Sequence, residues 1–282
     1  MTILVTAASG HLGRLVVDAL LDRGVAPADV VATSRRPEAL ADLAEGGVAV
    51  ARLDYDDAAS VEAALDGVDR MLLVSGTDPG ARLEQHRAVI DAAARAGVGL
   101  IAYTSIFRAD TSPLPLAPDH KATEELLAAS GVPWVALRNS WYSENYLSTV
   151  EQARATGEVV ASAGDGRVAS ASRVDYAAAA AAVLSEEGHA GNVYELGGAS
   201  WSFDDLAATI GAVVGREVAY RPVSTDEHVA ILESVGLDAG TAGFVAALDS
   251  GIRDGALADA PDDLERLIGR PATPLAETLA AA

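Results

Sequence analysis

Residues 6–14 read TAASGHLGR, a run of small residues between an apolar segment and a segment with helical spacing. Residues 2–6 are apolar or β-branched, and apolar residues recur after the run at Leu12, Leu15, Val16, Ala19 and Leu20. This pattern predicts a strand, a tight turn and a helix. A turn placed between the first strand and the first helix is typical of dinucleotide-binding folds, in which the pyrophosphate lies against the helix N-terminus.

The loop lacks one of the three glycines that are usual in such a turn. Gly10 and Gly13 supply the second and third, whereas Ala7 stands at the position of the first. Alanine is tolerated there if its φ is negative, because only a positive φ favours glycine. We therefore expect a bound cofactor to contact Ala7, Ser9, Gly10, His11 and Leu12. The alternative is a structural turn whose small residues serve packing alone.

The rest of the first half repeats an alternation of strands and helices. Apolar runs at 29–33, 48–53, 70–75, 99–104 and 134–138 alternate with helical patterns at 38–45, 58–65, 82–96 and 119–130. Continuous apolar strands that alternate with helices predict a parallel sheet covered on both faces. The fold class is therefore α/β, a doubly wound parallel Rossmann sheet with a smaller, mostly helical C-terminal substrate lobe.

The rhythm loosens after residue 138. Helical patterns at 143–156, 175–187 and 203–214 are mixed with strands at 192–196 and 217–221, and the tail from 225 is mostly helical. We expect an NADP-binding Rossmann domain at 1–140, to which 157–190 returns in part. Residues 141–282 should form the smaller substrate-binding lobe beside the carboxyl ends of the strands, where such folds bind ligands.

The composition excludes several classes of function. The chain has 282 residues, no cysteine and a formal net charge of −21, so disulfides, thiolate catalysis and cysteine-based zinc sites are ruled out. The charge repels nucleic acid and anionic lipid, so neither is expected as a partner, and no metal site is expected. The N-terminus has no basic region and no apolar run reaches membrane-span length, which predicts a cytoplasmic protein. The sequence leaves open whether it forms a homodimer.

The second strand indicates which dinucleotide is bound. Binders of NADH usually carry an acidic residue at its end, which accepts hydrogen bonds from the ribose hydroxyls. Here the end reads Thr33-Ser34-Arg35-Arg36, and a guanidinium is suited to a ribose 2′-phosphate. The cofactor is therefore expected to be NADP(H), with NADPH preferred over NADH and Arg35 in contact with it. The alternative is a solvated pair of surface arginines.

Several longer strings resemble one family. They are residues 6–13 (TAASGHLG), 35–37 (RRP), 102–105 (AYTS), 109–114 (ADTSPL), 119–124 (DHKATE), 137–146 (LRNSWYSENY), 163–170 (AGDGRVAS) and 268–275 (IGRPATPL). Through these strings the chain resembles the NmrA-like atypical short-chain dehydrogenases over nearly its whole length. Within that family it is most similar to the bacterial NAD(P)H:quinone oxidoreductases of the second type. The resemblance implies cofactor contacts from Asn139, from Ser75, Gly76 and Thr77 after the fourth strand, and from Arg173.

The usual catalytic pair of short-chain dehydrogenases is missing. In those enzymes a tyrosine donates a proton to a carbonyl, and a lysine four residues later lowers its pKa. None of the seven tyrosines here has a lysine at that spacing, and the resemblance places His120 and Glu124 at the two positions. The catalytic residue is therefore left unknown, with Tyr103, His120 and Asn139 as candidates.

A quinone is a less demanding acceptor, because it is flat, electrophilic and becomes aromatic when it gains hydride. Positioning it against the nicotinamide can supply much of the catalysis. Aromatic residues that could form the substrate walls are Phe107, Trp141, Tyr142 and Tyr146. The alternative is that these rings pack the junction between the two parts of the chain.

The leading hypothesis is an NADPH-dependent oxidoreductase that transfers hydride to a quinone or similar flat acceptor. The alternative is an NADP(H)-binding redox sensor that acts through a protein partner without turnover. An isomerase or epimerase would need an acid/base pair that the sequence does not supply.

Overall fold

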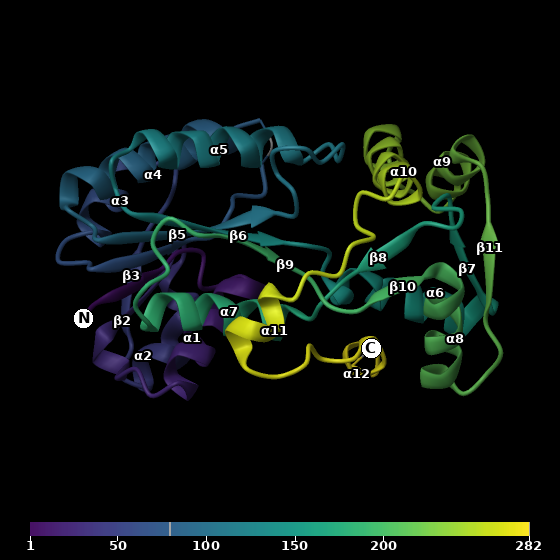
Figure 1. Cartoon of the computed structure of the whole chain (residues 1–282), viewed down its shortest axis with the longest axis horizontal. Coiled ribbons are helices and arrows are strands. Elements are labelled where there is room, and N and C mark those ends of the chain that lie inside the picture. Colours follow the sequence, from purple (N-terminus) through teal and green to yellow (C-terminus); the bar gives the residue numbers. More distant parts are fainter. Residues whose placement is uncertain (79, 282) are drawn as a thin grey trace.

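The computed structural model describes residues 1–78 and 80–281, and it has two parts that lie side by side (Figure 1). The first part is built on seven parallel strands in the order β3-β2-β1-β4-β5-β6-β9, which confirms the predicted fold class. The strands are β1 (Ile3–Val5), β2 (Val30–Ser34), β3 (Ala49–Arg52), β4 (Arg70–Leu73), β5 (Leu100–Ile106), β6 (Trp134–Asn139) and β9 (Val193–Leu196).

Helices cover both faces of this sheet (Figure 1). One face carries α1 (His11–Asp22), α2 (Ala41–Glu45), α7 (Arg173–Ser185) and α11 (Asp263–Ile268), and the other carries α3 (Ala58–Ala64), α4 (Arg82–Ala96) and α5 (Ala117–Ala129). Short 3₁₀ turns lie at Pro27–Asp29, Pro37–Leu40 and Ser143–Tyr146. Because successive side chains of a strand point to opposite faces, Ile3 and Val5 enter one apolar core and Leu4 enters the other.

The chain returns to the sheet after the second part has begun. Strand β9 pairs in parallel with β6, Ala136 opposite Val193, and α7 packs against α1. The returning segment thus starts at α7 and includes β9. Residues 158–161 and 167–169 pair outside the seven-stranded sheet, so the part of 157–190 that packs on the sheet is α7.

Within the described residues, the smaller lobe contains five α-helices and four short strands. Its helices are α6 (Leu147–Thr156), α8 (Phe203–Val214), α9 (Thr225–Ser234), α10 (Ala239–Arg253) and α12 (Leu275–Leu279). Its strands are β7 (Glu158–Ala161), β8 (Arg167–Ala169), β10 (Ser200–Ser202) and β11 (Ala219–Pro222), which form the pairs β10-β8 and β11-β7. In the described part of the chain, no helix combines the length and apolar character needed to cross a bilayer.

The strand order places the ligand site. Strands β1 and β4 are neighbours, and from this point the chain winds outward in both directions. The loops that follow β1 and β4 therefore diverge and leave a crevice at the carboxyl ends of the strands. The smaller lobe lies beyond this same edge of the sheet (Figure 1).

Candidate cofactor and active site

Two adjoining cavities lie at the carboxyl ends of the strands. One of about 350 Å³ extends over the ends of β2 and β3, and one of about 680 Å³ extends over β5 and β6 toward the smaller lobe. Both are lined by the loops after β1 and β4, with the same five residues: Ala7, Gly10, Ser75, Gly76 and Thr77. They are two halves of one groove that crosses the switch point of the sheet.

Ala7 adopts the conformation that the sequence reasoning did not expect. Its φ is +50°, in the left-handed region, where alanine is tolerated less well than glycine. Its carbonyl accepts a hydrogen bond from the Gly10 amide at 2.9 Å, which closes the turn. At Gly13 a Cβ would lie 2.5 Å from that carbonyl oxygen, so only glycine lets α1 approach the loop.

Helix α1 begins at this loop without a side-chain cap. Its N-cap residue is Gly10, which has no side chain. Among the described residues, no side chain caps the helix N-terminus, and its first turn contains no acidic residue. The positive end of the helix dipole and its free amides thus face the groove. His11 and Leu12 line the larger cavity and Ser9 the smaller one.

The smaller cavity carries two arginines at its outer end. Arg35 and Arg36 both line it. Whereas Arg14 pairs with Asp42 nearby, neither Arg35 nor Arg36 has an ion-pair partner within residues 1–78 and 80–281. The end of β2 is fixed to the glycine loop by the hydroxyls of Ser9 and Ser34, 2.8 Å apart, so the guanidinium groups stand on an ordered support.

The loop after β4 is held by hydrogen bonds to side chains of β5 and α4. The Ser75 amide donates to Thr104 Oγ1 at 2.8 Å, and the Gly76 amide donates to His86 Nε2 at 3.0 Å. The Gly76 carbonyl accepts from Arg82 Nε at 2.7 Å. Burial, together with the charge of Arg82, lowers the pKa of His86 to about 4, so this ring is neutral and serves as a fixed acceptor. Both backbone polar groups of Gly76 are therefore engaged by side chains of α4.

The larger cavity is mostly apolar and contains a few polar atoms without partners. Asn139 Oδ1 and Ser140 Oγ at the end of β6 are buried and lack a hydrogen-bond partner among the described residues, and both residues line the cavity. Trp141, Tyr142 and His120 line it as well. Buried polar atoms without a partner are rare and indicate a missing ligand or water.

Four predicted site residues do not line the groove. Phe107 and Tyr146 pack in the apolar core of the smaller lobe, where Tyr146 meets the ring of Trp201 edge-on. Tyr103 is fully buried beneath the cavity, behind His120. Arg173 lies one residue layer behind the larger cavity: its guanidinium bonds Asn145 Oδ1 at 3.1 Å and lies over the Tyr142 ring, and both of these residues line that cavity. It positions residues that line the site.

The structure adds residues that the sequence did not single out. Phe244 of α10, Leu116 and Leu257 complete the apolar wall, and Phe244 is 39% exposed. Phe244 sits in a tail whose helical pattern gives no hint of which side faces the groove. No signal in the sequence could have identified it.

Glu124, at the position that the resemblance gave to a catalytic lysine, has a structural role. Its carboxylate accepts from Arg138 Nε at 2.9 Å and Nη2 at 2.7 Å, and from Ser105 Oγ at 2.5 Å. All three residues are buried. A carboxylate engaged by three donors is not free for proton transfer to a substrate.

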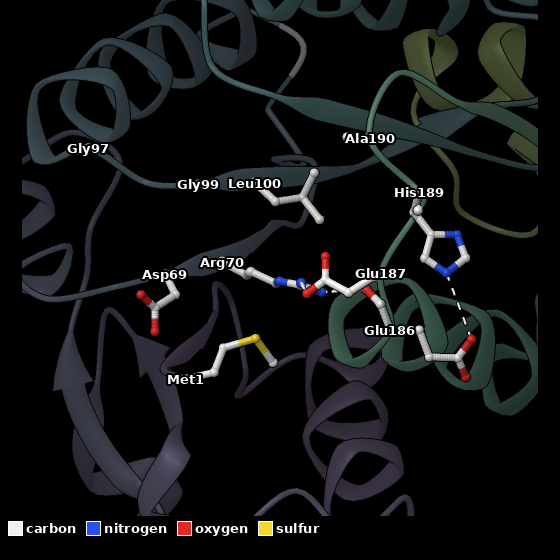
Figure 2. A pocket seen from close by; sticks show the side chains of 11 residues that line it. Met1, Asp69, Arg70, Gly97, Gly99, Leu100, Glu186, Glu187, His189 and Ala190 are labelled. Carbon is white, nitrogen blue, oxygen red and sulfur yellow. Dashed lines mark hydrogen bonds and ion pairs between the residues drawn. The ribbon is translucent and has the colours of Figure 1, made fainter.

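A further cavity of about 450 Å³ lies at the opposite edge of the sheet, at the amino ends of β4 and β5 (Figure 2). Its charged lining consists mainly of the carboxylates of Asp69, Glu186 and Glu187, which oppose an anionic ligand. The one arginine, Arg70, pairs with Glu187 and donates to the Leu184 carbonyl at the end of α7. The groove at the carboxyl edge, which is lined by Arg35 and Arg36, suits an anionic dinucleotide better than this acidic cavity.

Comparisons with known proteins agree with this assignment. Residues 7–187 match the sequence profile described as NAD(P)H-binding. The chain is 47% identical to quinone oxidoreductase 2 of Escherichia coli over 278 residues, covering 98% of this chain and 97% of that protein.

Solved structures give the same result. A crystal structure of an NADPH-dependent quinone oxidoreductase of Escherichia coli complexed with NADPH superposes with a TM-score of 0.95 at 46% identity, covering 99% of each chain. A triphenylmethane reductase of Citrobacter sp. complexed with NADP(H) also gives 0.95, at 37% identity and over 100% of each chain. These findings confirm the resemblance seen in the sequence: the chain belongs to the NAD(P)H-binding family.

Proposed function

We propose that the protein is an NADPH-dependent oxidoreductase that transfers hydride to a quinone or a similar flat, electrophilic acceptor. The observation that carries this is the continuous groove. It joins Arg35 and Arg36, which have no ion-pair partner among the described residues, to an aromatic, largely apolar chamber at the other end. The names of the Escherichia coli relatives, quinone oxidoreductases, support the choice of acceptor. We also propose a cytoplasmic location in a bacterium, as expected from the sequence.

The residues of the groove fit NADPH along its whole length. The uncapped start of α1, reached across Gly10, would receive the pyrophosphate. Arg35, without an ion-pair partner among the described residues, would bind the 2′-phosphate. Asn139 Oδ1, which has no hydrogen-bond partner in the described part of the chain, would accept from the nicotinamide amide or its ribose.

The chain itself supplies the orientation of the two reactants. When bound, NADPH supplies a hydride, which carries two electrons and one proton, and a proton from solvent completes reduction of a quinone to the hydroquinone. The hydrogen bond from the Gly76 amide to His86 holds the loop in the middle of the groove, while Trp141, Tyr142 and Phe244 would form flat walls for the acceptor. Since a quinone needs no strong general acid, the absence of a Tyr–Lys pair is compatible with turnover.

Two measurements test the proposal. NADPH oxidation should accelerate when a soluble quinone is added, and the Kd of NADPH should be lower than that of NADH. Arg35→Ala should weaken NADPH roughly 10- to 150-fold, the value of a charge-assisted hydrogen bond, and leave NADH unchanged. Arg95→Ala, which removes an exposed arginine on the outer face of α4, is the matched control. Equal affinity for both cofactors in the unmodified protein, or no turnover with several quinones, would contradict the proposal.

A further inference from the structure

A buried tyrosine and a histidine meet directly beneath the larger cavity. The Tyr103 hydroxyl, on β5, lies 2.8 Å from Nδ1 of His120 on α5. Tyr103 is fully buried, while His120 is 7% exposed and lines the cavity. The hydroxyl thus reaches the inner nitrogen of a ring whose edge is open to the cavity.

The hydrogen bonds around a second histidine decide where the protons lie. His86 Nε2 accepts from the Gly76 amide, so the single proton of this neutral ring is on Nδ1. That nitrogen lies 3.0 Å from Thr123 Oγ1 and donates to it, and Thr123 in turn donates to the Asp119 carbonyl at 2.9 Å. The Thr123 hydroxyl has therefore used its only proton.

Tyr103 has two neighbouring acceptors, His120 Nδ1 and Thr123 Oγ1. Thr123 Oγ1 already receives the His86 proton, whereas His120 Nδ1 lies 2.8 Å from the Tyr103 hydroxyl, so the buried Tyr103 proton is assigned to His120. Burial, with the charge of Arg82 added, lowers the pKa of His120 to about 3, so the ring is neutral. Because Nδ1 accepts, the proton of the neutral ring resides on Nε2.

We propose that Tyr103 is a positioning residue that holds His120 in the Nε2–H form, so that His120 presents a neutral N–H donor to the acceptor oxygen. This rests on the proposed function. As hydride adds to a ring carbon of the quinone, an electron pair moves onto the carbonyl oxygen, and a fixed donor stabilises that charge. His120 keeps its proton; solvent protonates both oxygens and takes up the proton lost from the ring carbon, which gives the aromatic hydroquinone.

The first test reads the tautomer without turnover. Nitrogen-15 NMR of histidine-labelled protein at neutral pH, assigned with His120→Phe, should show His120 neutral and protonated at Nε2. In Tyr103→Phe the ring should populate both tautomers. Tyr194→Phe is the matched control, since Tyr194 lies 2.8 Å from Nδ1 of His189 outside the groove and should leave the His120 signals unchanged. A His120 that is protonated at Nδ1, or charged, in the unmodified protein overturns the proposal even if Tyr103→Phe does not fold.

The second test uses turnover. His120→Phe should lower kcat roughly 100-fold, the usual loss for one oxyanion donor, and Tyr103→Phe roughly fivefold to tenfold, with the Kd of NADPH unchanged in both. Tyr103→Phe should have no further effect in the His120→Phe background, because it acts through His120. Additive losses overturn the positioning role. Absence of quinone reduction by the unmodified protein would overturn the proposed function instead, and the tautomer measurement would still stand.

Discussion

Replacement of Ala7 by glycine should stabilise the protein. Ala7 is held at φ +50°, and a left-handed backbone costs an L-residue about 1–2 kcal/mol. Glycine removes that cost but adds about 0.4–1 kcal/mol of chain entropy to the unfolded state. The side chain of Ala7 is exposed, so little packing is lost. The net expectation is a gain of about 0.5–1 kcal/mol in the free energy of unfolding.

Urea denaturation followed by circular dichroism measures this difference in the free energy of unfolding. In a separate thermal melt, the Tm should rise by about 1–3 °C for a chain of this size. Gly13→Ala is the companion variant, because its Cβ would lie 2.5 Å from the Ala7 carbonyl oxygen. It should lose about 1–3 kcal/mol, as overpacked sites do. If Ala7→Gly instead destabilises the protein by about 0.5 kcal/mol or more, which would be a typical entropic effect of glycine, the loop is not strained and our reasoning is wrong.

Three further variants probe the core, the acceptor chamber and a buried histidine. Glu124→Ala should lower the free energy of unfolding by about 3 kcal/mol, because Arg138 then stays buried with fewer acceptors. The control is Glu125→Ala at the exposed neighbouring position, which should change the free energy of unfolding by less than about 0.5 kcal/mol in the same urea titration. Phe244→Ala should raise KM for a quinone roughly 2- to 10-fold, because it removes an aromatic contact from the wall of the larger cavity. Val235, which is 64% exposed, provides the control: Val235→Ala should leave KM unchanged. An equal effect of the two variants would exclude a role for the Phe244 ring. The pKa of His86 is about 4 in the folded protein against 6.5 as its ordinary value, so the unfolded state binds more protons between these values and stability falls as the pH drops below about 6.5. In His86→Asn the loss of unfolding free energy between pH 7 and pH 5 should be smaller by about 2 kcal/mol, and an unaltered pH dependence would show that folding does not lower the pKa of this ring.

The sheet could be predicted because each strand carries its own signal. Apolar runs of strand length that alternate with helices specify a parallel sheet with little help from distant residues. The sequence does not show which strand β9 pairs with. Residues 193–196 look like any short strand, and only folding shows that they pair with β6 rather than within the smaller lobe. The short strands β7, β8 and β10 gave no usable pattern, since three or four residues do not establish a period.

The site shows the same division between local and distant information. The glycine loop and Arg35 could be placed because their position relative to a strand end fixes their direction. The aromatic residues could not, since a ring in 107–146 can face the groove or the core beneath it. Trp141 faces the groove, Phe107 packs in the core, and the missing wall is supplied by Phe244 from a helix about a hundred residues later. The φ of Ala7 likewise depends on contacts with Gly10 that composition does not reveal.

The repeated crossing of the chain between the two parts limits how this enzyme can evolve. The chain leaves the sheet after β6, returns at α7, leaves again after β9, returns at α11 and ends in the smaller lobe at α12 (Figure 1). No single segment encodes the smaller lobe, so it cannot be exchanged as a cassette between relatives. A point change at an exposed position of α10 such as Phe244 would instead alter the wall of the larger cavity and leave the buried contacts of the interwoven framework in place.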